Sequence, residues 1–448
     1  MISRKIGHPG QGTRCAAMTE TPLNDAVATQ YARWVYPEPI VNLPGWLQNN
    51  WQWYDPSHAH QMFWPDRRPR SALTILIAGC GTNQAAVFAY NNPESRVVAI
   101  DVSEPSLAHH RWLADEYKLS NLDVRQLPIE EAFALDEQFD LIVSTGVLHH
   151  LQDPVAGAKA LAGCLKHDGV LAVMLYARYG RIGVEMLQAT FRELGLKQNE
   201  ASLFMVKDAL AALSDDHPVK SYLNLAPDLD FDAGLVDTFL HGRDRSYTVK
   251  GCLELVEASG LVFQEWFLKS TYYALPRDNN AFLSAVAALP EREQWAVMEQ
   301  VNASNACHFF TATRKERPDA SYAIEFHSPL AIHYKPSFRF QCGLKSSQLY
   351  GYNRHLVLNA MELALMQEMD GQRSIREIVA AATASGVLPR RSPTELEHLA
   401  LELFASLWKR DFLAIQLPAT MKSASKFTRQ NDNKSLKKRH SIRPKKQS

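Results

Sequence analysis

The chain has 448 residues, of which 46% are hydrophobic and 21% charged, and its 48 basic side chains balance 48 acidic ones. A chain of this length is too long to fold around one ordinary hydrophobic core, which predicts a globular protein of two to four domains. No apolar run reaches the roughly 18–20 residues that a membrane helix needs, so we expect no membrane span and no membrane partner.

Both ends of the chain are expected to be disordered. Residues 1–25 are polar and lack the apolar core of a signal peptide, so they form a leader in which Met18 is an alternative start. Residues 418–448 form a basic tail, because residues 421–448 carry ten Lys or Arg side chains against one acid. Such a tail can contact nucleic acid or an acidic partner, or remain solvated against the acidic remainder of the chain.

The cysteines argue for a reducing environment. None forms a CxxC pair, and none combines with histidines at the spacing of a zinc site. His58 and His60 are two residues apart, but no third ligand lies within sequence reach. We therefore expect free thiols, no metal and a cytoplasmic location.

Between residues 71 and 179, apolar strands alternate with helices. The expected strands span residues 73–79, 96–103, 121–128, 139–146 and 168–177, and the expected helices span residues 83–92, 103–119 and 155–165. Ser103 is a plausible N-cap, with Pro105 in the first turn of its helix. The alternation predicts a doubly wound α/β fold with a parallel sheet, which binds ligands at the carboxyl ends of its strands.

After residue 179 the pattern changes to helices. A helical insertion is expected over about residues 181–260, and strands at residues 261–268 and 306–314 then complete the sheet. Farther on, helices are expected at residues 354–369, after Ser374, and from residue 394. Glu377 lies three residues after Ser374, which predicts a capping box. Three helices with a hairpin predict a smaller α+β domain of winged-helix type over residues 330–417.

The segment "AGCGTN", residues 78–83, brings glycines to the end of the first strand. It lacks the Lys-Ser/Thr pair of a P-loop, and Gln84 replaces the third small residue of the dinucleotide fingerprint. Asp101 ends the second strand, twenty residues after Gly81. A carboxylate there can bind both ribose hydroxyls of an adenosine, in an NAD enzyme or in a methyltransferase.

Five motifs, taken in order, favour a methyltransferase over an NAD enzyme. The segments "AGCGTN", "AIDVS", "LPIEE", "FDLIVSTGVLHHL" and "LKHDGVLAV" resemble the class I S-adenosylmethionine-dependent methyltransferases over about residues 74–175. The resemblance continues to about residue 314 and implies a seven-stranded Rossmann-like sheet in a domain of residues 26–315. The C-terminal module resembles, more loosely, the winged-helix domain behind some bacterial methyltransferases, including protein-lysine methyltransferases with regulatory domains.

The resemblance implies S-adenosylmethionine as the cofactor and assigns it a set of residues. These are Gly79, Cys80, Gly81, Asn83, Asp101, Val102, Ile129, Thr145 and Gly146. Three positions depart from the family: Ile77 replaces an acid, Asn83 a glycine and Pro128 a frequent aspartate. The missing acid puts the anchor of the methionine amino group in doubt. Tyr31, Arg33 and Tyr36 then either fold over the cofactor, with Arg33 on its carboxylate, or pack at the sheet edge.

The acceptor is not specified by any motif. We expect methyl transfer to a small molecule or protein by in-line displacement, which requires positioning and, for some acceptors, a base. The candidates for these roles are His149, His150, Tyr176 and Arg178. A structural role is favoured for the two histidines, whereas substrate contact and a structural role are equally compatible with Tyr176 and Arg178. The segment "FLHGRDRSYT", residues 239–248, either binds a substrate acid or forms ion pairs of its own.

Two other functions remain open on the sequence alone. Ile77 and Asn83 favour a catalytically weak, S-adenosylmethionine-binding regulator or partner-binding protein, and the Gly-rich turn leaves an NAD oxidoreductase as a third reading. The helix from residue 394 carries three acids, so we expect the C-terminal module to contact protein rather than nucleic acid.

Overall fold

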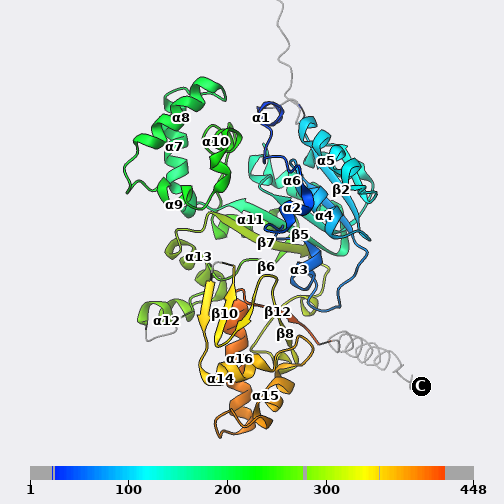
Figure 1. Ribbon diagram of the computed structural model, residues 1–448, viewed down its shortest axis with the longest axis vertical. Helices are drawn as coiled ribbons and strands as arrows, with labels where there is room; N and C mark the ends of the chain where they lie inside the picture. Colours follow the sequence, from blue (N-terminus) through cyan, green and yellow to red (C-terminus); the bar gives the residue numbers. More distant parts are fainter. Residues whose placement is uncertain (1–22, 24–25, 276–279, 353, 419–448) are drawn as a thin grey trace, which may run out of the picture.

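The computed structural model describes residue 23 and residues 26–275, 280–352 and 354–418. The predictions for the leader up to residue 22 and for the tail beyond residue 418 lie outside these residues. A central sheet separates a helical unit, at the top in Figure 1, from a C-terminal unit at the bottom. No described helix has the length and apolar content that spanning a bilayer requires.

The central sheet has seven strands in the order β3-β2-β1-β4-β5-β7-β6. Only β7 runs antiparallel to its neighbours, β5 and β6. The strands are β1 (Thr74–Ala78), β2 (Arg96–Asp101), β3 (Leu122–Gln126), β4 (Phe139–Thr145), β5 (Leu165–Tyr176), β6 (Leu261–Trp266) and β7 (Cys307–Arg314). The predicted doubly wound, seven-stranded sheet is therefore confirmed, including its last two strands.

Both faces of the sheet are covered, because alternate residues of each central strand point to opposite sides. Leu76 and Ala78 pack into one apolar cluster, and Ile75 and Ile77 pack into the other. The first cluster includes α6 (Pro154–Gly163), α11 (Val249–Ala258) and α13 (Glu291–Val301). The second includes α3 (Pro56–Phe63), α4 (Gln84–Asn91) and α5 (Glu104–Tyr117). Ser103 caps α5 as predicted, accepting a hydrogen bond from the Ser106 amide.

The helical insertion is shorter than predicted. Helices α7 (Ile182–Glu193), α8 (Glu200–Ala212), α9 (Val219–Leu223) and α10 (Asp232–Phe239) enclose an apolar core of their own. Helix α11 packs Cys252 and Leu255 into the sheet cluster instead. The insertion therefore ends near residue 240 and not near 260, because the apolar face of α11 is buried by the sheet.

The C-terminal unit differs in detail from the prediction. Its strands are β8 (Lys335–Phe338), β9 (Gly343–Lys345), β10 (Gln348–Gly351), β11 (Arg354–Val357) and β12 (Leu413–Gln416), and its helices are α14 (Ala360–Gln367), α15 (Ile375–Ala384) and α16 (Pro393–Lys409). The expected helix at residues 354–369 begins as strand β11, and Asn359 caps α14 only afterwards. The capping box of Ser374 and Glu377 is confirmed.

The winged-helix prediction is not confirmed. Among the described residues, only β12 follows α16, and it pairs with β8 rather than forming a hairpin. Strands β9, β10 and β11 form a separate antiparallel sheet ahead of the helices. Five helices had no sequence prediction: α1 (Ala26–Arg33), α2 (Leu43–Leu47), α12 (Ala281–Ala287), and the helices α3 and α13 that cover the sheet.

Candidate functional site

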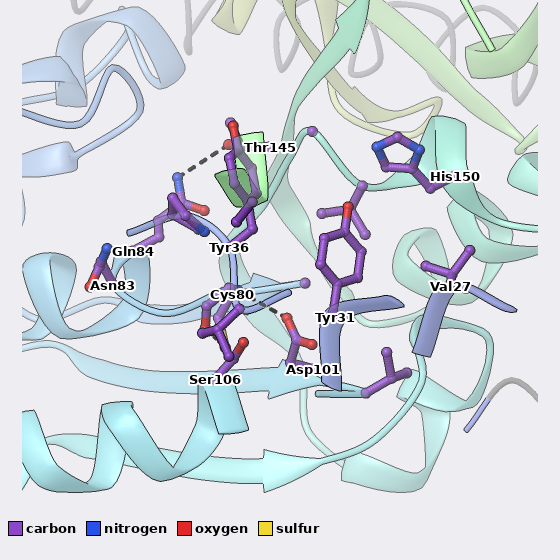
Figure 2. A pocket seen from close by; sticks show the side chains of 18 of the residues that line it. Val27, Tyr31, Tyr36, Cys80, Asn83, Gln84, Asp101, Ser106, Thr145 and His150 are labelled. Carbon is purple, nitrogen blue, oxygen red and sulfur yellow. Dashed lines mark hydrogen bonds between the residues drawn. The ribbon is translucent and has the colours of Figure 1, made fainter. Parts of the chain in front are cut away.

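A cavity of about 760 Å³ opens at the carboxyl ends of β1, β2 and β4, where a doubly wound sheet binds its ligands. The strand ends contribute Gly79, Asp101 and Thr145, and the N-terminal segment contributes Tyr31 and Tyr36. Figure 2 shows these N-terminal tyrosines beside Asp101 and the Gly-rich turn. Segments far apart in the sequence therefore enclose one space.

All nine residues predicted to bind the cofactor line this cavity. They are Gly79, Cys80, Gly81, Asn83, Asp101, Val102, Ile129, Thr145 and Gly146. Of the four candidate catalytic residues, His150 and Tyr176 line it as well. His149 is fully buried outside the lining, and Arg178 is exposed. The structure thus brings together eleven of the thirteen predicted site residues.

The backbone conformation and the neighbouring protein atoms both require glycine at two positions of the turn. Gly79 and Gly81 have φ values of 75° and 54°, in the left-handed region that side chains rarely adopt. A Cβ atom on Gly79 would lie 2.5 Å from a Val147 methyl carbon, and one on Gly81 would lie 2.9 Å from Pro37. The glycines therefore permit close packing against protein atoms as well as an approach to a ligand.

Asp101 is held in place by two backbone amides. Its carboxylate oxygens accept hydrogen bonds from Gly81 and Ser103, each at 2.9 Å. Burial raises the pKa of Asp101 above its ordinary value. The carboxyl group thus joins the ends of β1 and β2 and lies at the cavity wall, where a ribose hydroxyl can reach it.

A strap of residues 36–40 crosses the Gly-rich turn. The Asn83 side chain accepts a hydrogen bond from the Ile40 amide at 2.9 Å and donates one to the Glu38 carbonyl at 2.7 Å. The Thr82 hydroxyl donates to the Pro37 carbonyl at 2.8 Å. Asn83, which departs from the family pattern, therefore anchors this strap.

Two tyrosines, one in α1 and one in the strap, also contact the helical insertion. The Tyr31 hydroxyl donates a hydrogen bond to Asp237 on α10 at 2.7 Å, and the Tyr36 hydroxyl donates one to Asp228 at 2.5 Å. Arg33 does not join them: it is exposed and lies 3.8 Å from Glu200. The prediction that Arg33 faces the cofactor is therefore wrong, because the turn of α1 directs it to solvent.

Several lining residues had no sequence prediction. The Gln84 side-chain amide donates to the Thr145 hydroxyl and to Gln52, both at 3.2 Å. Further lining residues outside the predicted set include Trp46, Asn50, Glu130, Asp228 and Phe231. Residues 46–52 and 228–234 lie outside the recognised motifs, and only the tertiary structure brings them to the sheet. Glu130, which follows the predicted Ile129, is the exception that its motif could have suggested.

One end of the cavity borders a buried polar cluster. Arg181 binds Asp244 through its Nη2 atom at 3.0 Å, and its guanidinium carbon lies 3.6 Å from the Tyr176 ring centroid. The Gln188 side chain also donates to Asp244, at 2.9 Å. Asp244 is therefore paired within the protein, as one of the two interpretations of residues 239–248 expects, whereas Arg243 of the same segment lines the cavity.

Two groups of side chains in this cluster bring potential metal ligands within 4.8 Å of one another. They are His149, His150 and Asp244, and His150, Asp237 and His241. The first group contains the partner of the permanently charged Arg181, which opposes a second cation there. In the second, the His241 Nδ1 atom accepts a hydrogen bond from the Arg243 amide at 3.0 Å, so the Nε2 atom of a neutral ring carries the proton. This tautomer does not fit a metal ligand.

His58 and His60 have structural roles. The His58 ring stacks on Phe340 with centroids 4.2 Å apart, and the His60 Nε2 atom accepts a hydrogen bond from the Arg70 amide at 3.2 Å.

Comparisons with known proteins show which proteins this chain resembles. Residues 76–171 match the model of a methyltransferase domain. An uncharacterized protein of Synechococcus sp. is 29% identical over 55% of this chain and 61% of its own length. Malonyl-[acyl-carrier protein] O-methyltransferase of Acetivibrio thermocellus is 33% identical over 24% of this chain and 37% of its own. The matches to these two relatives thus cover less than two thirds of either one.

A solved structure extends the similarity to most of the fold. PKMT2 from Rickettsia typhi in complex with AdoHcy aligns with 81% of this chain and 75% of its own, with a TM-score of 0.58 and 14% identity. This identity supports the fold alone. Together the matches support a methyltransferase domain that uses S-adenosylmethionine.

Proposed function

We propose that this chain transfers a methyl group from S-adenosylmethionine to a small-molecule or protein acceptor by in-line displacement. The observation that carries the proposal is the convergence of all nine predicted cofactor residues on one cavity, with Asp101 at the end of β2. The methyltransferase domain matched over residues 76–171 contains all nine.

The residues that line the cavity suit the chemistry of the cofactor. Val102, Leu127 and Ile129 supply an apolar wall for an adenine, beside the Asp101 carboxylate that can hold the ribose. Gly79 and Gly81 both line this cavity and have left-handed backbone, with Val147 and Pro37 packed where their Cβ atoms would point. When bound, S-adenosylmethionine supplies a methyl carbon on a positively charged sulfur, and the electron pair of the broken carbon–sulfur bond stays on that sulfur.

The protein's own contribution is binding, orientation and the exclusion of water. The strap of residues 36–40 closes one side of the cavity through the contacts of Asn83, Tyr36 and Thr82. Ile77 is fully buried in the sheet, so its position offers no carboxylate to a cofactor amino group. We assign the anchor of that group to the polar atoms at the end of β4, around Thr145 and Gln84.

The remaining parts of the chain suggest a protein partner in the cytoplasm. Helix α16 carries Glu395, Glu397 and Glu402, an acidic character that supports contact with protein rather than nucleic acid. The basic tail beyond residue 418 is the segment suited to nucleic acid. The five described cysteines are free, which supports a reducing compartment.

Calorimetric titration with S-adenosylmethionine, S-adenosylhomocysteine and NAD tests the proposal. We expect micromolar binding of the two adenosyl ligands, no binding of NAD, and a loss of about 10- to 100-fold in affinity in Asp101→Asn, which removes a charged acceptor. Asp115→Asn, an exposed change on α5, is the matched control. Binding of NAD alone would overturn the proposal, and binding without transfer of a labelled methyl group to cell extract would favour the regulator.

A further inference from the structure

A row of side-chain hydrogen bonds lies in the cavity wall beside the Gly-rich turn. The Gln84 side-chain amide donates both of its hydrogens, one to the Thr145 hydroxyl and one to the Gln52 side-chain oxygen. Figure 2 shows the bond from Gln84 to Thr145 at the end of β4. The Gln84 side-chain oxygen has no hydrogen-bond partner among the described residues and is not one of the buried unpartnered atoms, so a ligand in the cavity can reach it.

The cofactor amino group needs an acceptor of this kind. When bound, S-adenosylmethionine presents an ammonium group with hydrogens to donate, and the buried Ile77 offers it no carboxylate. Gln84 begins α4 directly after the Gly-rich turn and bonds to Thr145 at the end of β4. Its free oxygen therefore lies between two of the segments that the methyltransferase resemblance assigns to the cofactor.

Gln52 holds the Gln84 side chain in this orientation. A glutamine side chain has many rotamers, and each hydrogen bond that it makes restricts them. The Gln52 oxygen accepts one of the two bonds of the Gln84 amide, at 3.2 Å, and Gln52 lines the cavity as well. The position of Gln52 thus decides how firmly the free oxygen of Gln84 is presented to a ligand.

Two tryptophans flank Gln52 in the chain and contact the C-terminal unit. The Tyr352 ring, between β10 and β11, meets the Trp51 and Trp53 rings edge to face, with centroids 5.2 Å apart in both pairs. Phe340, between β8 and β9, lies 6.0 Å from the Trp51 ring. Rings from the C-terminal unit therefore pack against the segment that carries Gln52.

These rings are separate from the core of the C-terminal unit. Tyr352 is 49% exposed and Phe340 is 46% exposed, and neither belongs to the buried cluster beneath them. The segment has a second support, because the Gln52 carbonyl accepts a hydrogen bond from the Asp55 amide at 3.2 Å. A substitution of Tyr352 therefore removes the support of the C-terminal unit without opening a cavity in a core.

We propose that the C-terminal unit sets the affinity of the chain for its cofactor, with Tyr352 as a positioning residue that acts through Gln52 on Gln84. This inference rests on the proposed methyl transfer. The Gln84 side-chain oxygen accepts a hydrogen bond from the cofactor amino group, in place of the missing acid. Because such coupling is reciprocal, a bound cofactor also stabilises the contact between Tyr352 and the two tryptophans.

Two ligands isolate the contribution of the amino group. S-adenosylhomocysteine is compared by calorimetry with the analogue in which a hydrogen replaces its amino group. We expect Tyr352→Ala to weaken binding of S-adenosylhomocysteine about 5- to 20-fold and to leave binding of the analogue within twofold of the wild type. Tyr352→Phe, which keeps the ring, should bind both ligands as the wild type does. Tyr350→Ala, which changes another half-exposed ring on β10, is the matched control.

Unchanged binding of S-adenosylhomocysteine in Tyr352→Ala would overturn the proposal, because the bond from Asp55 would then suffice to hold Gln52. An equal loss for both ligands would overturn it as well, since the effect would not pass through the amino group.

Variants of Gln84 test the acceptor in the same assay. Gln84→Leu has no side-chain oxygen and should bind S-adenosylhomocysteine about 10- to 100-fold more weakly, with little change for the analogue. Gln84→Glu keeps an oxygen and adds a negative charge, so it should bind S-adenosylhomocysteine at least as tightly as the wild type. Equal weakening in the two variants overturns the proposal. Failure of the wild-type chain to bind either adenosyl ligand would instead overturn the proposed function.

Discussion

At the residue scale, the Gly-rich turn shows how backbone geometry and packing act together. Gly79 donates its amide hydrogen to the Ile100 carbonyl at 2.8 Å, which holds the end of β1 against β2. Its φ of 75° and the nearby Val147 side chain both exclude a larger residue. The position of the turn, and with it the amide that binds Asp101, therefore depends on the absence of a side chain.

Comparison of Gly79→Ala with a control variant separates the cost of the left-handed backbone from the cost of packing against Val147. Left-handed backbone costs an alanine about 1–2 kcal/mol, and overpacking against Val147 adds about 1–3 kcal/mol. Gly195→Ala is the matched control, because Gly195 has a φ of 71° and nothing near its Cβ position. We expect urea unfolding to show the larger loss for Gly79→Ala, which should also weaken S-adenosylhomocysteine binding. Equal losses in the two variants would contradict the packing argument.

At the element scale, a buried acid joins α11 and α13, two of the helices that cover the sheet. Glu299 on α13 accepts a hydrogen bond from the Val249 amide at the start of α11, at 2.9 Å. Burial raises the pKa of Glu299 to about 7. Its neighbour His308 on β7 stays neutral, because burial lowers the pKa of that ring to about 4. When Glu299 ionises near neutral pH, His308 is therefore uncharged and cannot form an ion pair with the carboxylate.

The folded protein thus binds the Glu299 proton more tightly than the unfolded chain does. This contribution to stability is complete below about pH 4.5 and is lost as the pH rises through about 7. Glu299→Gln, which cannot ionise, should match the wild type near pH 4 and exceed its free energy of unfolding by up to about 3 kcal/mol at pH 8. Glu293→Gln on the exposed side of α13 is the control. A difference that is independent of pH would contradict the assignment.

At the scale of the whole molecule, Asp411 joins the C-terminal unit to the sheet domain. Its carboxylate accepts hydrogen bonds from the Lys269 and Ser270 amides and from the Arg339 and Arg354 guanidinium groups. Burial disfavours its charge, but the surrounding cations outweigh burial and hold the pKa of Asp411 below its ordinary value. The buried Arg317 donates a hydrogen bond to the Phe63 carbonyl at 2.9 Å, so the segment that follows β7 is docked on the sheet domain.

Asp411→Asn tests this junction. Asparagine tolerates the φ of 64° at this position, so the change removes charge without adding backbone strain. We expect a loss of about 3–5 kcal/mol, because Arg339 loses its buried partner. Faster proteolysis between residues 318 and 335 should accompany a lower urea midpoint. Asp370→Asn, an exposed turn residue, serves as control, and unchanged proteolysis in Asp411→Asn would contradict the proposed role.

The sequence by itself predicted the sheet, most of the helices that cover it and nine residues that line the cavity. Short-range patterns carry these features: apolar strands between glycines, a capping residue at Ser103, and Asp101 at a fixed distance from Gly81. Each depends on neighbours within one strand–helix unit, so periodicity and spacing suffice to predict it.

Only the tertiary structure decided what surrounds those positions. Tyr31 and Asp237, which are 206 residues apart, meet beside the cavity, and the Arg243 carbonyl lies 3.0 Å from the His150 Nδ1 atom although 93 residues separate them. No local pattern distinguishes His149 from His150, since both follow the same strand. Both rings are buried, but only His150 belongs to the cavity lining. Contacts between distant segments are set by the whole core rather than by any one stretch of sequence.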